Sequence, residues 1–372
     1  MPFINATIVK RLRFFATTLF ASGLIFVYLD KTILASALLI GSLTLMALSF
    51  QWSKSLRGFS YTFWILTAVT CSLFYPQYFS GIGAFSFKLL IVPLLQLIMF
   101  GVGTTMGYKD FGGIFRQPKA VIIGITCQFA IMPLVGFTIA NVFNFPLEIA
   151  AGIILVGCVP SGLASNVMSY IANANVPLSI TVTAVATLLA PLMTPMLMEL
   201  LAGQFVSVDF LTMTWDIIQM VIIPICAGLL YNHLLGGKFP WLDQAMPVVS
   251  MVSIGVIITI ITAAGRDSLV AVGPMLVLAV LIHNVCGFIF GYLASRLAGL
   301  DEKSCRTISI EVGLQNGGLA SGLALQMGKV ATVGLAPAIF GPLMNITGSS
   351  LATWWRGKPT KEKEKPEPVT IH

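Results

Sequence analysis

Charged side chains are scarce in this sequence. Asp, Glu, Lys and Arg account for 9% of its 372 residues, whereas 57% of the residues are hydrophobic. Soluble domains carry about 25% charged residues, so this chain has too little polar surface to cover a water-soluble globule. The composition and the mean hydropathy of +0.92 predict an all-α polytopic membrane protein whose partner is the lipid bilayer.

Patterns that mark other chemistries are also absent. The six cysteines stand singly, with no CxxC or Cys/His spacing, so the sequence supports neither a zinc site nor a disulfide framework. There is no HExxH, no P-loop and no nucleophile elbow, and we expect no enzymatic activity. The net charge of +7 does not predict a nucleic-acid partner, because the basic residues flank apolar segments and are not interleaved with aromatic residues.

Twelve apolar segments divide the chain, and several are near the length of about 20 residues that crosses a membrane. Basic residues gather before the first segment and after every second one, as in the group Arg296, Lys303 and Arg306. Under the positive-inside rule this alternation predicts a multi-pass protein of the inner or plasma membrane with both termini in the cytoplasm. The segments fall near 13–29, 32–50, 60–78, 87–106, 120–142, 148–173, 176–201, 211–232, 243–264, 270–295, 303–328 and 331–354.

Two of these segments are interrupted by residues that weaken a helix. The segment 148–173 contains Pro160-Ser161-Gly162, and the segment 303–328 contains Gly317-Gly318. Both segments contain the tetrapeptide Gly-Leu-Ala-Ser, and the predicted topology runs them in opposite directions. Irregular backbone at membrane depth persists only where it is buried in protein or lines a wet cavity. The pattern therefore predicts an inverted-repeat transporter whose site lies where the two breaks meet.

The interrupted helices also organise the rest of the chain. Each would be the fourth of five helices in one half of a ten-helix inverted-repeat core (5+5), with the two broken helices crossing. The predicted divisions are an N-terminal transmembrane hairpin over 1–57, a first repeat over 58–205, a second repeat over 206–356 and a disordered cytoplasmic tail over 357–372.

Glu311 is the only carboxylate inside the segment 303–328. A carboxylate at membrane depth is costly unless a cation, a proton or a hydrogen-bond network accompanies it, and such residues are usually functional. One alternative is a buried glutamate satisfied by Asn and Gln neighbours. Close packing of helices by small residues is an alternative for the glycines, but it does not account for Asn166, Gln315 and Asn316 beside them. Free N–H groups at helix breaks favour an anion, and free carbonyls suit a small hard cation such as sodium.

At these residues the sequence resembles the bile acid:sodium symporter family, especially its bacterial members. The resemblance extends over about 60–355. It is strongest in "ILVGCVPSGLASNVMSYIANANVPLSITVTAVATLLAPLMTP" (154–195) and "RTISIEVGLQNGGLASGLA" (306–324). It implies ten core helices in two inverted repeats, broken fourth and ninth core helices that cross, and two sodium ions near the crossing. We expect a monomer.

The resemblance implies residues for each site. One sodium site would use Ser165, Asn166, Ser179, Thr183 and Glu311. The other would use Gln128, Glu311, Gln315 and backbone carbonyls near Val312 and Leu314. The substrate would bind beside Gly162, Leu163, Asn316, Gly317, Met344 and Asn345. Leu163 and Met344 stand where relatives carry threonine and histidine, which makes the implied cavity more apolar.

The sequence thus predicts a secondary active transporter that couples sodium to an organic anion by alternating access. The resemblance implies a bile acid or a small carboxylate such as pantoate, ketopantoate or pyruvate. A proton-coupled or uncoupled carrier of small carboxylates is the alternative within transport. A membrane ligand sensor is a third interpretation, and the short charged tail, which carries no signalling domain, argues against it.

Overall fold

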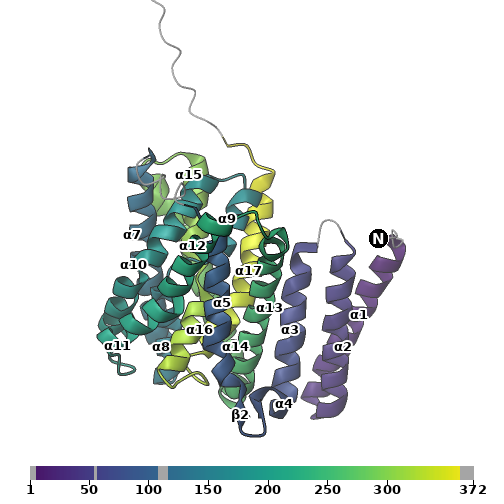
Figure 1. Cartoon of the computed structure of the whole chain (residues 1–372). Helices are drawn as coiled ribbons and strands as arrows, with labels where there is room; N and C mark the ends of the chain where they lie inside the picture. Colours follow the sequence, from purple (N-terminus) through teal and green to yellow (C-terminus); the bar gives the residue numbers. More distant parts are fainter. Residues whose placement is uncertain (1–5, 54–56, 108–115, 361–372) are drawn as a thin grey trace, which may run out of the picture.

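The computed structural model describes residues 6–53, 57–107 and 116–360. Within these ranges the chain is helical apart from short connections and one small hairpin (Figure 1). The helices are α1 (Ala6–Tyr28), α2 (Thr32–Gln51), α3 (Arg57–Phe74), α4 (Gln77–Ser80), α5 (Ile91–Thr105), α7 (Pro118–Val142), α8 (Leu147–Cys158), α9 (Ala164–Ile171), α10 (Val176–Ala202), α11 (Phe210–Ile217), α12 (Ile223–Leu235), α13 (Pro240–Ala264), α14 (Arg266–Leu297), α15 (Glu302–Gly313), α16 (Gly317–Gln326) and α17 (Leu335–Arg356).

Eight helices within the described residues are long and apolar enough to cross a membrane, and Gly58–Phe74 and Leu147–Cys158 are shorter apolar helices. Each of the twelve predicted segments corresponds to one helix or to consecutive helices, which confirms an all-α polytopic membrane protein. The hairpin of strands β1 (Gly81–Ile82) and β2 (Phe85–Ser86) was not predicted, because two-residue strands leave no periodicity to detect. It precedes the 3-10 turn η1 (Phe87–Leu90).

The first predicted break lies between α8 and α9. Proline disfavours helical geometry in the residue before it, and Val159, which precedes Pro160, has extended backbone angles (φ −81°, ψ 157°). The freed carbonyl of Cys158 accepts a hydrogen bond from the Thr194 hydroxyl at 2.8 Å. The helix resumes at Ala164.

The second predicted break lies between α15 and α16. The helix ends at Gly313, and Leu314 is extended (φ −109°, ψ 101°). Asn316 starts the next helix, because its side-chain oxygen accepts a hydrogen bond from the Leu319 N–H at 3.0 Å. Both interruptions that the sequence predicted are therefore present.

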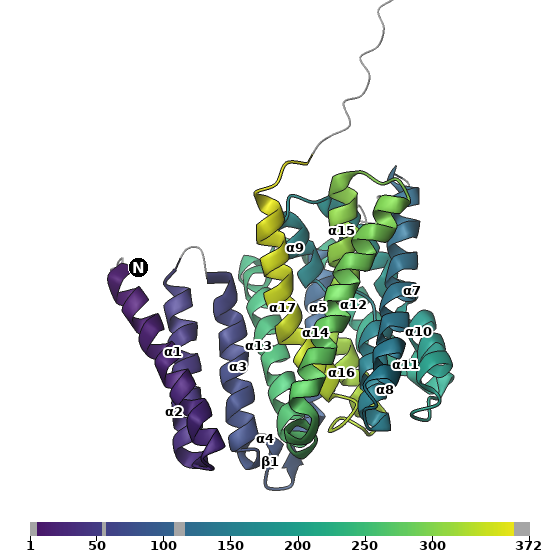
Figure 2. The same cartoon turned by 180° about the vertical axis from the view of Figure 1, so that it is seen from behind.

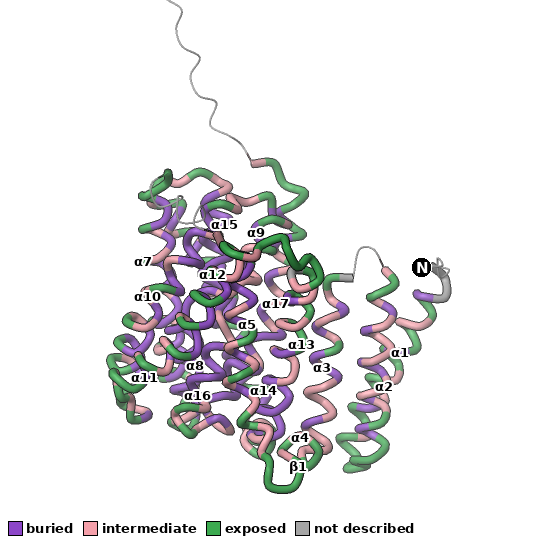
Figure 3. The backbone as a smooth tube through the Cα atoms, in the orientation of Figure 1, coloured by how far each residue is buried: buried purple, intermediate pink, exposed green. Residues whose placement is uncertain are grey.

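The two interrupted pairs of helices run in opposite directions. In both cartoon views α9 and α15 lie at one end of the bundle, and α8 and α16 lie at the other (Figures 1 and 2). Buried residues concentrate around these helices, whereas α1 and α2 show mostly intermediate and exposed positions (Figure 3). The site predicted at the breaks is thus in the most deeply buried part of the molecule.

The helices α1 and α2 form the predicted N-terminal hairpin. They stand in a row with α3 at the edge of the bundle, and α3 alone lies between them and α13 (Figures 1 and 2). Exposed apolar side chains such as Phe14, Ile25 and Ile33 cover the hairpin, as expected for helices that face lipid. The hairpin is therefore peripheral to the two breaks.

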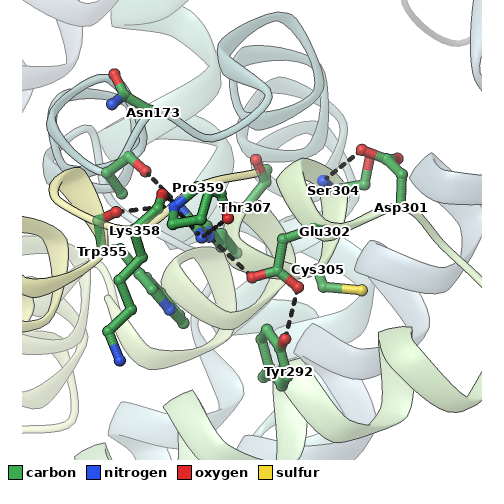
Figure 4. Close-up of polar contacts among 12 residues, drawn as sticks. Asn173, Tyr292, Asp301, Glu302, Ser304, Cys305, Thr307, Trp355, Lys358 and Pro359 are labelled. Carbon is green, nitrogen blue, oxygen red and sulfur yellow. Dashed lines mark hydrogen bonds and ion pairs between the residues drawn. The ribbon is translucent and has the colours of Figure 1, made fainter. Parts of the chain in front are cut away.

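A buried arginine joins three helices at the end of the bundle where α15 begins. Arg306 is 2% exposed, and its Nε donates to Glu302 Oε1 at 2.9 Å. Its Nη1 donates to the Ala172 and Trp355 carbonyls at 3.3 and 3.1 Å. In Figure 4, Trp355, Lys358 and Pro359 lie on one side of the cluster and Glu302 lies on the other. The Tyr292 hydroxyl donates a hydrogen bond to Glu302 Oε2 at 2.7 Å.

The last described residues complete this cluster. Arg306 also donates to the carbonyls of Lys358 at 3.4 Å and Pro359 at 3.3 Å. Residues 361–372 of the predicted disordered tail lie outside the described residues. Ala172 and Trp355 lie where α9 and α17 end, so the positive guanidinium adds hydrogen bonds to helix-end carbonyls. The Trp355 carbonyl also accepts one from the Lys358 N–H at 2.9 Å.

Candidate functional site

The two breaks are hydrogen-bonded to each other. Ser161 and Gln315 form an isolated antiparallel β-bridge. The Gly162 N–H donates to the Leu314 carbonyl at 3.1 Å, and the Asn316 N–H donates to the Pro160 carbonyl at 2.9 Å. A Cβ atom on Gly162 would lie 3.1 Å from the Gln315 carbonyl oxygen, so glycine allows this close approach. We call this pair of bonded breaks the crossover.

Glu311 lies one helical turn before the crossover and is fully buried. Its Oε2 accepts hydrogen bonds from Ser161 at 2.6 Å and from Thr183 at 2.8 Å, and its Oε1 accepts one from Ser179. Within the described residues, no lysine, arginine or histidine forms an ion pair with this carboxylate. Its partners are therefore neutral hydroxyl groups.

The first predicted set of sodium ligands is gathered around this carboxylate. Ser179 and Thr183 lie 2.9 and 3.4 Å from Asn166 Oδ1. Ser165 and Thr183 are hydrogen-bonded at 3.2 Å, and Ser165 also donates to the Gly162 carbonyl at 2.8 Å. The structure thus brings Ser165, Asn166, Ser179, Thr183 and Glu311 together from α9, α10 and α15.

Hydrogen-bond donors are in short supply in this group. A hydroxyl has one proton and two acceptor lone pairs, whereas a carboxylate is an acceptor only. Ser179 and Thr183 each lie within reach of both Glu311 and Asn166 Oδ1, but each has a single proton to donate. The Ser165 proton is directed to a backbone carbonyl. The group therefore has more oxygen lone pairs than protons, which suits a cation with oxygen ligands.

Two side chains of the second predicted set, Gln128 and Gln315, are hydrogen-bonded to each other, whereas Glu311 lies with the first set and, within the described residues, has no hydrogen bond to either glutamine. Gln128 Nε2 donates to the Val159 carbonyl at 3.0 Å and to Gln315 Oε1 at 2.8 Å. Gln315 Nε2 donates to the Val312 carbonyl at 2.6 Å. Gln128 is fully buried, and none of the described residues donates a hydrogen bond to its Oε1. A buried acceptor without a donor is uncommon, and a bound cation would satisfy it.

The backbone carbonyls of this set already have partners. Gly313, between Val312 and Leu314, accepts a hydrogen bond from Asn284 Nδ2 on α14 at 2.7 Å. Asn284 Oδ1 in turn accepts one from Thr347 on α17 at 2.5 Å. The Leu314 carbonyl is used by the crossover. A carbonyl oxygen has two lone pairs, so each can keep its partner and still face an ion.

The residues implied for the substrate differ from the ion residues in exposure. Gly162, Leu163, Asn316, Gly317 and Asn345 are partly exposed, whereas Met344 is buried at 8% exposure. Gly317 lies beside α17, since a Cβ atom on it would lie 3.5 Å from the Pro337 carbonyl oxygen. Asn345 donates to the Gly341 carbonyl of the same helix at 2.9 Å. Gly162, Leu163, Asn316 and Gly317 lie in or next to the two breaks, whereas Met344 and Asn345 lie on α17.

The sequence interpretation missed two residues of this site. Ser161 was recognised as part of the break but not as a partner of Glu311. Asn284 was not assigned to the site, although its side chain donates a hydrogen bond to the Gly313 carbonyl at the end of α15. A signal for Ser161 was available, because it lies within the interrupted stretch itself. A signal for Asn284 was also available, because His283 and Asn284 are polar residues in the middle of the apolar segment 270–295, but only the three-dimensional contacts connect Asn284 to α15.

Comparisons with known proteins show which proteins the chain is similar to. The model of the sodium bile acid symporter family matches residues 92–272. The chain is 37% identical over 307 residues to the uncharacterized sodium-dependent transporter YocS of Bacillus subtilis, covering 82% of this chain and 94% of that protein. It is 36% identical over 270 residues to the probable chloroplastic sodium/metabolite cotransporter BASS1 of Arabidopsis thaliana, covering 73% of this chain and 67% of that protein. For BASS1 of Oryza sativa subsp. japonica the identity is 34% over 305 residues, covering 81% of this chain and 73% of that protein.

Proposed function

Because the chain belongs to the sodium bile acid symporter family and is a transporter rather than an enzyme, we propose that it takes up an organic anion by alternating access. Sodium is the coupling ion that its relatives' names give. Each positive charge that moves inward contributes about 2.3 kcal/mol per 100 mV of membrane potential. The chain exposes its site to the two sides in turn by moving one group of helices against the other.

The observation that carries this proposal is the donor-poor oxygen group around Glu311. A fully buried carboxylate whose partners are neutral hydroxyls has no positive charge beside it, and a bound cation would supply one. We assign the first sodium ion to Ser165, Asn166, Ser179, Thr183 and Glu311. The second takes Gln128, Gln315, Glu311 and carbonyls near Val312 and Leu314, and the free oxygen of Gln128 supports it.

The anion binds next to the crossover in this proposal. The N-terminal ends of α9 and α16 lie at the two breaks, where the helix dipoles favour negative charge. Leu163 and Met344 make the surroundings apolar, which favours an anion with a hydrocarbon portion over a highly polar one. The substrate class is therefore a bile acid or a small carboxylate such as pantoate, ketopantoate or pyruvate.

The same proposal includes the predicted organisation. A core of two inverted repeats, 58–205 and 206–356, is supported by the opposite directions of the two interrupted helix pairs. Both breaks come from one chain, so we propose a monomer as the transporting unit. We place the protein in the inner or plasma membrane with both termini in the cytoplasm, which follows from the distribution of basic residues.

Uptake by proteoliposomes tests the coupling. The purified protein is reconstituted, and accumulation of labelled candidate anions is measured with an inward sodium gradient and with choline in place of sodium at fixed pH. Accumulation that needs sodium is expected, and Glu311→Ala should reduce it to the level of empty liposomes. Glu148→Gln is the matched control, because this carboxylate lies at the start of α8 in an ion pair with Lys329. Accumulation in choline driven by a pH gradient would instead favour the proton-coupled alternative.

A binding screen identifies the substrate class. Thermal unfolding of the detergent-solubilised protein is measured with bile acids and small carboxylates, each with and without sodium. A ligand that binds the folded state raises its stability by mass action. We expect one class to stabilise the protein only when sodium is present. Stabilisation by an anion that is never accumulated would indicate the ligand-sensor interpretation.

A further inference from the structure

Ser161 occupies a position that belongs to both breaks. It lies between Pro160 and Gly162 where α8 ends, and its backbone forms the bridge with Gln315 of the second break. Hydrogen bonds from Gly162 and Asn316 flank this bridge on its two sides. The residue is 1% exposed. Any displacement of Ser161 must therefore move the crossover as well.

The side chain of Ser161 is directed into the oxygen group around Glu311. Its Oγ donates to Glu311 Oε2 at 2.6 Å and lies 3.5 Å from Thr183 Oγ1. Thr183 donates to the same carboxylate oxygen at 2.8 Å. Two hydroxyls from different elements thus donate to Oε2, and the Ser179 hydroxyl donates to Oε1.

These contacts distinguish Ser161 from a serine that only stabilises its own turn. Ser165, a member of the first predicted sodium set, donates its proton to the Gly162 carbonyl of its own segment and lies 3.2 Å from Thr183 Oγ1. The hydrogen bonds described for Ser161 Oγ are with residues of α10 and α15. Its oxygen keeps lone pairs while its proton is donated to the carboxylate. A cation held by Oε2 would find this oxygen beside it.

We propose that Ser161 is an additional hydroxyl ligand of the ion at Glu311 and that it transmits ion occupancy to the crossover. This inference rests on the proposed sodium-coupled transport. One residue supplies an oxygen to the ion through its side chain and a bridge to the second break through its backbone. Sodium binding therefore draws the two breaks into a single fixed arrangement. The affinity for sodium depends on Ser161, although the ligand set implied by the family resemblance does not include it.

The test compares Ser161→Ala with wild type in reconstituted uptake at varied sodium concentration. Loss of one oxygen that serves a charged group should raise the half-saturating sodium concentration about tenfold. The maximal rate at saturating sodium should stay within about twofold of wild type, because the other ligands remain. Sodium-dependent thermal stabilisation, measured without substrate, should shift to higher sodium by the same factor.

Ser169→Ala is the matched control. Ser169 is a fully buried serine on α9, and its Oγ has no hydrogen-bond partner among the described residues. Its removal should leave the sodium dependence unchanged. Ser161→Thr, which keeps the hydroxyl, should retain a half-saturating sodium concentration closer to wild type than Ser161→Ala does.

Three results would overturn the inference. Wild-type sodium dependence in Ser161→Ala would show that this hydroxyl is not a ligand, while sodium-coupled uptake itself would stand. A loss of stability that is equal with and without sodium, at unchanged half-saturating sodium, would assign Ser161 a purely structural role. Sodium-independent uptake by the wild-type protein would instead refute the proposed function, and this inference with it.

Discussion

Two charged side chains of α15, Arg306 and Glu311, are buried five residues apart, and their surroundings differ in kind. Arg306 has a carboxylate partner in Glu302 and donates to carbonyls of Ala172, Trp355, Lys358 and Pro359. Glu311 has only neutral hydroxyl partners. The chain itself compensates the charge of the arginine, whereas it leaves the charge of the glutamate for something else to compensate.

This difference separates a structural charge from a ligand site. Burial of an ion is costly, and breaking a buried pair leaves an uncompensated charge. Arg306 meets that cost with groups that stay in place, so it fixes the ends of α9, α15 and α17 relative to one another. The hydroxyl partners of Glu311 offset only part of the cost of burying its charge, so a cation that binds at the crossover is stabilised there.

The largest effect on folding is expected from Arg306→Ala. It removes the buried guanidinium from Glu302 and from several helix-end carbonyls, so stability should fall by about 3 kcal/mol or more. Thermal unfolding in detergent without sodium measures this. Arg296→Ala is the control, because Arg296 is an exposed residue 3.9 Å from the same glutamate, and it should change little. A fully stable Arg306→Ala protein would contradict a structural role.

In contrast to Arg306→Ala, Glu311→Gln should impair sodium binding and not folding. Removing the charge should leave the sodium-free stability equal to or higher than that of wild type, because no cation partner is lost. Stabilisation by sodium, about 2.7 kcal/mol at a concentration 100 times the dissociation constant, should disappear. Unfolding at a series of sodium concentrations checks both expectations. Strong destabilisation without sodium would mean that the carboxylate is structural, as Arg306 is.

Gln128→Leu is expected to have an intermediate effect. It removes the buried oxygen that has no donor within the described residues, together with the hydrogen bonds to Val159 and Gln315. The half-saturating sodium concentration for uptake should rise about tenfold. The Hill coefficient for sodium should fall toward one if this oxygen serves a second ion. An unchanged Hill coefficient would assign Gln128 to packing of the crossover.

The smallest effect is expected from Glu148→Gln. Glu148 pairs with Lys329 and accepts a hydrogen bond from Thr332 at 2.6 Å, but it remains 38% exposed. Exposed pairs contribute about 0–1 kcal/mol. The half-saturating sodium concentration of the Glu148→Gln variant should match that of wild type, and uptake at varied sodium concentration measures it. A large change would mean that sodium affinity depends on carboxylates far from the crossover.

The sequence predicted those features that depend on local chemistry. Pro160 marked the first break, and Gly317-Gly318 directly follow the second, whereas a proline such as Pro133 lies inside a continuous helix. The roles of Ser161 and Asn284 could not be read in this way. Ser161 meets Glu311 across 150 positions of the chain, and only the crossover of two distant segments creates that contact.

Arg306 shows the limit of the topological interpretation. It was assigned to a basic group in a cytoplasmic loop, but it is buried within α15. The positive-inside rule counts charges near helix ends and does not see which of them turn inward. The contacts with Ala172 and Trp355, 134 and 49 positions away, decide this.

The Arg306 cluster also has a consequence for biosynthesis. Its acceptors include Lys358 and Pro359, which the ribosome adds 52 and 53 residues after Arg306. A chain is made from its N-terminus at about 5–20 residues per second, so α15 emerges seconds before these acceptors. Until then the guanidinium lacks these two of its acceptors. The contacts between α15 and the segment after α17 can therefore form only after Pro359 has been added.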